Sequence, residues 1–334
     1  MELNMELGAD SYAITVRRGA LKDAGTLFSL DRKVLIVTDS GVPAEYAEAV
    51  AACASAPVIV TIPAGESSKS LEQFAALEEK MTSLRFTRGD CAVAVGGGVV
   101  GDLCGFAAAC YMRGIDFYNV PTTLLSQVDS SIGGKTAIDF GGYKNIVGAF
   151  KQPRRVLIDP EVLRTLPPRQ VANGMAESVK MALTSDAALF SLFEAENPEE
   201  HLDEIILSSL KIKKAVVEQD VRESGLRRVL NFGHTIGHGI ESASGLLHGE
   251  CVAIGMLPMC EKPVRERLRR VLERLGLPTG LPCAPEAVWE AVAHDKKSSS
   301  PGVTAVLCRE PGSFVLQSMT VEALKERFAD CFGL

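Results

Sequence analysis

Short runs of consecutive apolar residues alternate with helical patterns along the first half of the chain. The runs are rich in β-branched residues and show no apolar–polar alternation, which is typical of parallel strands buried on both faces. They lie at Val34–Val37, Val58–Ile62, Ala92–Val95 and Phe117–Val120. Residues 44–52 and 71–84 between them have helical spacing and charged outer faces. This order of elements predicts a doubly wound α/β domain with a parallel sheet.

Strand patterns become rare after about residue 160, where helical patterns take over. Pro167 and Pro168 can open a helix that continues to about Leu183, because proline is tolerated in the first turn. Further helices are expected at 202–220, 234–244, 250–259 and 264–275, and only 302–307 looks extended. The sequence therefore predicts a Rossmann-like α/β domain over residues 1–160 and a mainly α-helical domain over residues 161–334.

Composition limits the classes of protein to which the chain can belong. Its 334 residues include 35 Lys and Arg against 42 Asp and Glu, which gives a net charge of −7. That balance argues against a disordered chain and against a basic surface for nucleic acid. The nine cysteines are scattered without a CxxC pair. The acidic first residues and the polar or glycine-rich apolar stretches lead us to expect no signal peptide and no membrane span. We therefore expect reduced thiols in a cytoplasmic protein that does not enter a membrane.

A glycine-rich turn follows the strand expected at 92–95. Gly96, Gly98 and Gly101 form a GxGxxG pattern that opens a helix of small residues. Glycines there let the backbone approach a pyrophosphate at the N-terminus of the helix. A tight turn that is merely packed by glycines explains the pattern equally well. Asp39 is a separate candidate for a ribose hydroxyl, although an ordinary helix cap explains it as well.

A second glycine-rich segment, residues 120–145, is dense in polar side chains and poor in typical surface charges. Its candidates for binding an oxygen-rich anion are Asp129, Lys135, Lys144 and Asn145. A solvated glycine loop is the alternative, but such loops rarely lie between so many apolar residues.

Three of the five histidines, His234, His238 and His248, lie close together in the sequence. A catalytic zinc takes three protein ligands and leaves one position open, so this trio favours a metal site over structural histidines. Spacing alone places His234 and His238 on one helix face. The segment HTIGH nevertheless lacks the glutamate that serves as general base in HExxH metalloproteases.

Two sets of charged residues lie on helices that also have apolar faces. Glu177 and Lys180 share the face opposite an apolar stripe, and that face could meet solvent or line a cleft. Lys213 lies in the middle of the apolar arc of helix 202–220, where an unpaired ammonium would be costly. Either Asp220, in a structural ion pair, or a bound substrate anion must compensate the charge of Lys213.

Taken together and in this order, the segments resemble those of 3-dehydroquinate synthases, within the sugar-phosphate cyclases. They are PAGESSK at 63–69, GGGVVGD at 96–102, VPTTLLSQVDSSIGGKT at 120–136, KN at 144–145, TLPPR at 165–169, GLRRVLNFGHTIGH at 225–238, HGE at 248–250 and DKK at 295–297. The resemblance implies a dehydroquinate synthase-like fold with NAD and Zn²⁺ (or Co²⁺) as cofactors. It also implies a lyase of the shikimate pathway that converts 3-deoxy-D-arabino-heptulosonate 7-phosphate to 3-dehydroquinate and phosphate. That reaction combines transient oxidation, phosphate elimination, reduction and intramolecular aldol closure.

The same resemblance implies a role for individual residues. The metal ligands match Glu177, His234 and His248. Catalytic residues match Asp129, Lys135, Lys180, Lys213, Arg227, Asn231 and His238. Substrate contacts match Arg113, Lys144, Asn145 and one of Lys296 and Lys297. Dinucleotide contacts match Asp39, Glu66, Lys69, Gly98, Val99, Val100, Gly101, Asp102, Thr122, Thr123, Lys135, Lys144 and Thr165. Arg113 matches an arginine that reaches the site of a neighbouring subunit, which implies a homodimer.

Three other functions stay open on the sequence. They are a related cyclase that acts on a hexose or heptose phosphate without a carboxylate, a metal-dependent alcohol dehydrogenase of similar fold, and a non-catalytic metal-binding module. Lys213, Arg227 and Asn231 favour an acid substrate, because an unpaired arginine–lysine pair suits a neutral sugar poorly. The expected partner is therefore a small sugar-acid phosphate, with no nucleic acid and no membrane.

Overall fold

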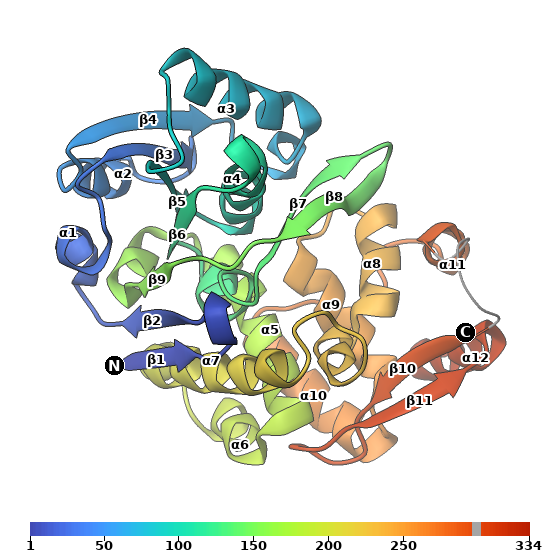
Figure 1. Cartoon of the computed structure of the whole chain (residues 1–334). Coiled ribbons are helices and arrows are strands. Elements are labelled where there is room, and N and C mark those ends of the chain that lie inside the picture. The colour runs from blue at the N-terminus through green and yellow to red at the C-terminus, as the bar shows by residue number, and fades with distance from the viewer. Residues whose placement is uncertain (296–301) are drawn as a thin grey trace. The chain divides into compact units, whose positions relative to one another are not determined.

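The computed structural model describes residues 1–295 and 302–334 and divides into two compact units (Figure 1). We call Met1–Leu166 the N-terminal unit and Pro167–Leu334 the C-terminal unit. The boundary expected after residue 160 falls in a 3₁₀ helix, η6 (Pro160–Thr165), shortly before this division. Lys296 and Lys297 lie outside the described residues. None of the helices within the described ranges combines the length and the apolar character needed to cross a membrane.

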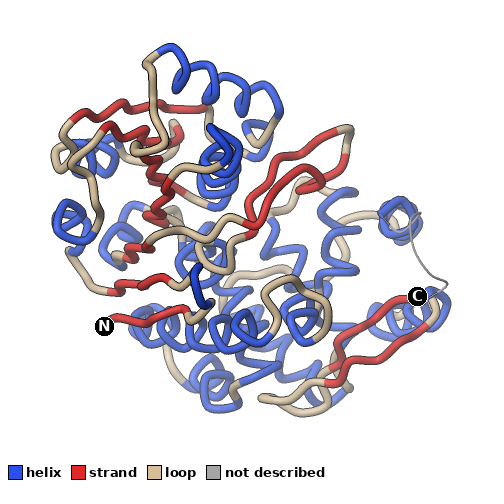
Figure 2. The backbone as a smooth tube through the Cα atoms, viewed as in Figure 1, coloured by secondary structure: helices blue, strands red, loops and turns tan. Residues whose placement is uncertain are grey.

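A seven-stranded sheet forms the centre of the N-terminal unit (Figure 2). The strand order is β1-β2-β9-β6-β5-β3-β4, and all neighbours are parallel except β1 and β2. The strands are β1 (Glu2–Met5), β2 (Tyr12–Val16), β3 (Lys33–Asp39), β4 (Ala56–Ile62), β5 (Cys91–Gly96), β6 (Asp116–Pro121) and β9 (Arg155–Ile158). The four strands predicted from apolar runs are β3 to β6, and the parallel α/β class is confirmed.

Helices cover both faces of this sheet, which explains why the central strands are apolar without alternation. Leu35 and Val37 of β3 share a core with α3 (Leu71–Ser83) and α4 (Gly98–Cys110). Val34 and Ile36, which point to the other face, share a second core with α1 (Ala24–Leu27) and α2 (Ala44–Ala51). Both sets of side chains are fully buried.

The polar segment 120–145 is not an open loop. It contains a short π-helix, Ser126–Ser130, and then an antiparallel hairpin of β7 (Lys135–Phe140) and β8 (Tyr143–Phe150). Gly141 and Gly142 have φ values of 61° and 84° at the turn, a conformation that favours glycine in a two-residue hairpin turn. The hairpin places Lys135 at its base, and Lys144 and Asn145 near its turn.

Helices dominate the C-terminal unit, as predicted. They are α5 (Pro168–Ser185), α6 (Ala187–Ala195), α7 (Leu202–Gln219), α8 (His234–Ala243), α9 (His248–Met256), α10 (Lys262–Arg274), α11 (Pro285–Asp295) and α12 (Val321–Phe332). The expectation that only 302–307 is extended was wrong. Strand β10 (Val303–Leu307) pairs with a second strand, β11 (Val315–Met319), whose side chains are mostly exposed and so lack an apolar pattern.

Glu78 on α3 gives the N-terminal unit a pH-dependent stability. Its Oε1 is buried and has no hydrogen-bond partner among the described residues, and burial raises its pKa from 4.5 to about 7. The folded state therefore favours the protonated form of Glu78. The contribution of this carboxyl group to the free energy of unfolding is fully present below pH 4.5 and is lost as the pH rises through about 7. We expect Glu78→Gln to reduce the loss of stability across this interval in denaturant unfolding. The exposed Glu79→Gln serves as the control, and identical pH profiles for wild type and Glu78→Gln would contradict this assignment.

Candidate functional site

The glycine-rich turn of the N-terminal unit lies at the carboxyl end of β5. Gly96 ends the strand, and α4 begins at Gly98. A Cβ on Gly96 would come within 2.6 Å of the Val100 side chain, and one on Gly98 within 3.1 Å of Ser130 Oγ. The glycines thus permit close packing, as expected for a tight turn that is merely packed by glycines. They also begin a helix whose first amide groups have no partner within the helix, which is the arrangement that binds phosphates.

A buried ion pair stands beside this turn. Lys69 is 5% exposed, and its Nζ lies 2.5 Å from Asp102 Oδ2 and 3.8 Å from Glu66 Oε1. Burial lowers the pKa of Lys69, but the two carboxylates outweigh burial and raise it. Lys69 therefore stays an ammonium close to the first turn of α4, where a pyrophosphate would find a cation as well as a helix N-terminus.

Other residues expected to contact a dinucleotide follow neighbouring parallel strands. Asp39 ends β3, and its Oδ1 accepts the N–H of Gly41 at 2.8 Å. Thr122 and Thr123 follow β6. Since β3, β5 and β6 are parallel and adjacent in the order β6-β5-β3, these residues share the carboxyl edge of the sheet, where α/β sheets bind ligands. Thr165 lies beside the first turn of α2, where its hydroxyl contacts the Tyr46 hydroxyl at 3.0 Å.

The remaining candidates of the N-terminal unit are more dispersed. Lys135 and Asn145 are separated by about four rungs of the hairpin, or roughly 13 Å along a strand. Lys144 lies next to Asn145, near the turn. Asp129 is half-buried in the π-helix, while Arg113 is exposed after α4 with a φ of 67°.

The C-terminal unit brings Glu177, His234 and His248 together. One possible ligand atom from each lies within 4.8 Å of the others. His248 Nε2 is 3.2 Å and His234 Nε2 is 3.6 Å from Glu177 Oε1. Glu177 is on α5, His234 begins α8 and His248 begins α9. Three helices thus assemble the group that the family resemblance selected.

The donor set of this group fits a divalent metal. His234 Nδ1 lies 3.1 Å from the Phe232 carbonyl, and His248 Nδ1 lies 3.2 Å from Glu241 Oε2. A carbonyl and a carboxylate can only accept, so Nδ1 carries a hydrogen in both rings and Nε2 faces Glu177. The Glu177 side chain is 1% exposed, and neither of its oxygens has a hydrogen bond of ordinary geometry with the described residues. Two imidazole nitrogens and one carboxylate are a common catalytic zinc set.

The two histidines have opposite protonation preferences. Burial lowers the pKa of His234 well below its ordinary value, and Lys180 and the other two rings lower it further. Burial also acts on His248, but its contacts with Glu177 and Glu241 outweigh burial and raise its pKa to about 9. A proton on His248 thus balances the carboxylates when no cation is bound, and a divalent cation would replace that proton.

The helix face shared by Glu177 and Lys180 is buried, which excludes the solvent-exposed alternative. Both side chains are at most 2% exposed, and Lys180 Nζ is in direct contact with Glu177 Oε2. The pair therefore places an ammonium beside the candidate metal group.

Lys213 and Arg227 are also buried, with 6% and 2% of their surfaces exposed. Asp220, one of the two alternatives for compensating Lys213, accepts the N–H groups of Gly225 and Arg227 on Oδ2. Its Oδ1 accepts the N–H and the hydroxyl of Ser224. Burial raises the pKa of Asp220, but these hydrogen bonds outweigh it and hold the pKa well below its ordinary value. Asp220 therefore organises the loop between α7 and the 3₁₀ helix Leu226–Asn231.

Asn231 and His238 are exposed members of the predicted set in the described part of the C-terminal unit. The Asn231 amide donates to Glu223 Oε1. The His238 ring lies 5.3 Å from that of His234 and 5.8 Å from that of His248, measured between centroids. All three histidines are thus neighbours, but the His234–His238 pair suggested by spacing is not the pair that Glu177 joins.

The sequence did not predict the contacts that align α5 with α9. Arg169 holds Glu250 through two hydrogen bonds of 2.7 and 2.8 Å. Asn173 Oδ1 accepts the N–H of Gly249 at 2.6 Å, and a Cβ on Gly249 would lie 2.0 Å from the Asn173 carbonyl. These contacts flank His248. The sequence pattern that could have predicted these contacts is Glu250 in the first turn of the helix that begins at His248.

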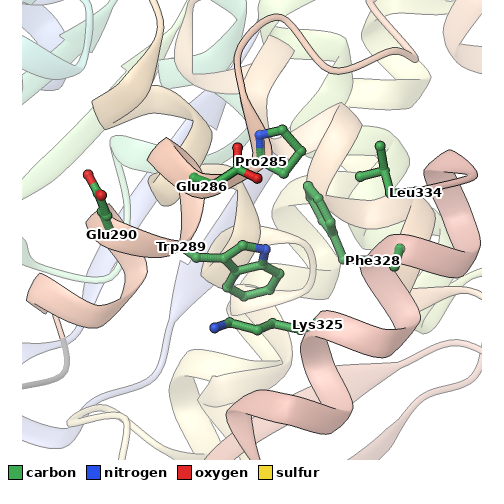
Figure 3. A pocket seen from close by; sticks show the side chains of 8 residues that line it. Pro285, Glu286, Trp289, Glu290, Lys325, Phe328 and Leu334 are labelled. Carbon is green, nitrogen blue, oxygen red and sulfur yellow. The ribbon is translucent and has the colours of Figure 1, made fainter.

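A separate pocket lies between α11 and α12 (Figure 3). Its volume is about 760 Å³, and its walls include Trp289, Phe328 and Lys325. The Lys325 ammonium lies 5.7 Å from the centre of the Trp289 ring. None of the predicted site residues within the ranges 1–295 and 302–334 lines this pocket.

Comparison with known proteins identifies the family of the chain. The family model described as 3-dehydroquinate synthase N-terminal matches residues 59–173, and the one described as 3-dehydroquinate synthase C-terminal matches residues 174–298. The 3-dehydroquinate synthase of Latilactobacillus sakei subsp. sakei is 44% identical, with 93% of each chain covered. That of Symbiobacterium thermophilum is 43% identical over 93% of this chain and 95% of its own. The chain belongs to the 3-dehydroquinate synthase family.

Solved structures place the family among related synthases. A 2-deoxy-scyllo-inosose synthase, in complex with carbaglucose-6-phosphate, NAD⁺ and Co²⁺, is 26% identical with a TM-score of 0.88, covering 99% of this chain and 100% of its own. The 2-epi-5-epi-valiolone synthase of Streptomyces hygroscopicus subsp. jinggangensis, with NAD⁺ and Zn²⁺, is 29% identical with a TM-score of 0.86, covering 97% and 98%. A butanol dehydrogenase of Thermotoga maritima (15% identity, TM-score 0.67, covering 96% of both chains) shares the fold alone.

Proposed function

We propose that this chain converts 3-deoxy-D-arabino-heptulosonate 7-phosphate to 3-dehydroquinate and phosphate, as a lyase of the shikimate pathway. The observation that supports this most strongly is identity of 41–44% to 3-dehydroquinate synthases over nearly the whole chain. The two related synthases with other names and solved structures are only 26% and 29% identical. Lys213 and Arg227 are consistent with a substrate that carries a carboxylate.

The cofactors of this proposal are NAD and a divalent metal, Zn²⁺ or Co²⁺. When bound, NAD would take a hydride from a substrate hydroxyl and return it within the same turnover, while the metal would lower the pKa of that hydroxyl. Glu177, His234 and His248 would hold the metal through one carboxylate and two Nε2 atoms. The α4 N-terminus and Lys69 would hold the pyrophosphate of NAD.

The basic residues would bind and orient the substrate. Lys180 and Lys213 are buried ammonium groups, and Arg227 is a buried guanidinium, so substrate oxygens would meet them in a medium of low polarity, where charges attract strongly. Asn231 and His238, which are exposed, would contact substrate hydroxyls. Fixing one flexible substrate through several steps is mainly a matter of positioning. The net charge of −7 does not oppose this, because it describes the far field of the chain and not the field within a site.

The same proposal includes a cytoplasmic homodimer in which Arg113 reaches the site of the partner subunit. Arg113 is exposed and has a left-handed backbone conformation at the end of the 3₁₀ helix Tyr111–Arg113, which follows α4. Exposure leaves the guanidinium available to a second chain. Sedimentation of the purified chain would show whether it forms a dimer.

The behaviour of the nicotinamide distinguishes this proposal from an alcohol dehydrogenase. A cyclase returns the hydride in every turnover, so reduced nicotinamide should not accumulate at steady state while product forms. A dehydrogenase would produce one reduced nicotinamide for each substrate consumed. Absorbance of the reduced cofactor during turnover measures this directly, and stoichiometric accumulation would contradict the proposed function.

A further inference from the structure

Glu241 is the acidic neighbour of His248 on the side away from Glu177. Its Oε2 lies 3.2 Å from His248 Nδ1, while His248 Nε2 faces Glu177 Oε1 at the same distance. Its side chain is 12% exposed. The imidazole of His248 is therefore held at both nitrogens, by a carboxylate on each side.

We propose that Glu241 is a positioning residue for the metal centre, which rests on the proposed metal site. A carboxylate that accepts the Nδ1 hydrogen fixes the ring orientation of His248 and keeps the Nε2 lone pair directed at the metal. It also makes the imidazole a stronger donor. His234 Nδ1 instead donates to the backbone carbonyl of Phe232, so among the described residues the carboxylate support goes to His248.

The packing of α8 on α9 fixes the distance between Glu241 and His248. Glu241 stands two turns after His234 on α8, and therefore on the same side of the helix. A Cβ on Gly255 of α9 would lie 2.1 Å from the Gly233 carbonyl, and one on Gly237 would lie 3.2 Å from the Cys251 carbonyl. Glycines thus allow the two helices to approach closely, and a close-packed interface deforms little.

Charge balance also supports this role. Glu177 and Glu241 supply two negative charges on opposite sides of His248, which matches the charge of a divalent cation. Lys180 contacts Glu177 from the other side and would partly offset that carboxylate. The second carboxylate restores the attraction for a cation that Lys180 reduces.

A competing explanation makes Glu241 a ligand. His238, Glu241 and His248 form a second group whose possible ligand atoms lie within 4.8 Å of one another. A second ion there would bind His248 through Nδ1. The two explanations differ in the number of ions bound by each chain, so stoichiometry separates them.

The experiment measures the zinc dissociation constant of the full-length chain by competition with a chromophoric chelator. We expect Glu241→Ala to weaken zinc binding by about 10- to 100-fold with one ion still bound per chain, the range found for residues that support metal ligands. Glu241→Gln should lose less, because its amide oxygen still accepts the Nδ1 hydrogen. Glu204→Gln, an exposed change on α7, is the matched control and should leave the constant unchanged. The visible spectrum of the cobalt-loaded chain should change in Glu241→Ala and recover in Glu241→Gln.

The outcomes separate this inference from the proposed function. Tight zinc binding by the wild type with an equal constant in Glu241→Ala would overturn the positioning role alone. Two ions in the wild type, one of them lost in Glu241→Ala, would overturn it in favour of a second site. A wild type that binds no zinc would overturn the metal site and this inference with it. If thermal unfolding shows that Glu241→Ala does not fold, the zinc dissociation constant of Glu241→Gln decides. A wild-type constant in Glu241→Gln would then overturn the inference, because removing the charge would have no effect.

Discussion

Alanine at position 248 should reduce phosphate release by about 10³-fold or more and remove most of the bound zinc. His248 supplies one of three proposed ligand atoms, and its Nε2 lies 3.2 Å from Glu177 Oε1. A metal that polarises a substrate oxygen contributes several kcal/mol to catalysis, and each 1.36 kcal/mol is a factor of about ten in rate. Metal analysis and phosphate release, measured on the same preparation of His248→Ala, check this expectation.

The fold should survive this change. His248 begins α9 and is half-buried, and the bonds of Glu250 to Arg169 and to the Leu247 amide, which hold this helix end, stay in place. His201→Ala, a change at a half-buried histidine outside the metal group, is the control and should retain activity and zinc. Full activity with unchanged zinc content in His248→Ala would refute the metal assignment.

Methionine in place of Lys213 should abolish most of the activity while thermal stability is retained or increased. The side chain is 6% exposed within the apolar arc of α7, and a buried ammonium costs more to desolvate than an apolar side chain of similar length. Asp220 keeps its hydrogen bonds to the loop amides in the variant. Loss of a preorganised charged donor typically lowers kcat by about 10²- to 10³-fold.

The matched control for Lys213→Met is Lys211→Met on the same helix. Lys211 is exposed, so its replacement should leave activity unchanged. Kinetics and thermal unfolding of both variants distinguish a substrate-binding lysine from a structural one. A large loss of stability in Lys213→Met, with activity retained in the fraction that folds, would support the structural ion pair instead.

The sequence predicted the central strands and the long helices because burial on both faces leaves a continuous apolar run. It missed β1, β2 and β9, which lie toward one edge of the sheet, and β11, whose side chains are mostly exposed. An exposed strand needs no apolar pattern, since backbone pairing with β10 supplies its hydrogen bonds. The β7–β8 hairpin was also not predicted, because every residue of β8 except Ala149 is exposed and the strand therefore has no apolar pattern.

Local spacing could propose the metal site but could not choose its members. Within one helix, His234 and His238 are the obvious pair, whereas Glu177 and His248 arrive from α5 and α9. Only packing between helices determines which side chains meet. The same holds for the helix face of Glu177 and Lys180. A helical pattern shows which side chains share a face, but it does not show whether solvent or another helix covers that face. The hydrogen bonds of Asp220 to the loop amides are a further contact that spacing does not reveal.

Phosphate release by the purified chain, supplied with NAD and zinc, measures the proposed reaction itself. We expect release from 3-deoxy-D-arabino-heptulosonate 7-phosphate, with 3-dehydroquinate formed in equal amount and no net reduced nicotinamide. We expect no release from glucose 6-phosphate, which has no carboxylate to meet Lys213 and Arg227. Release from glucose 6-phosphate, with none from the seven-carbon acid phosphate, would contradict the proposed function.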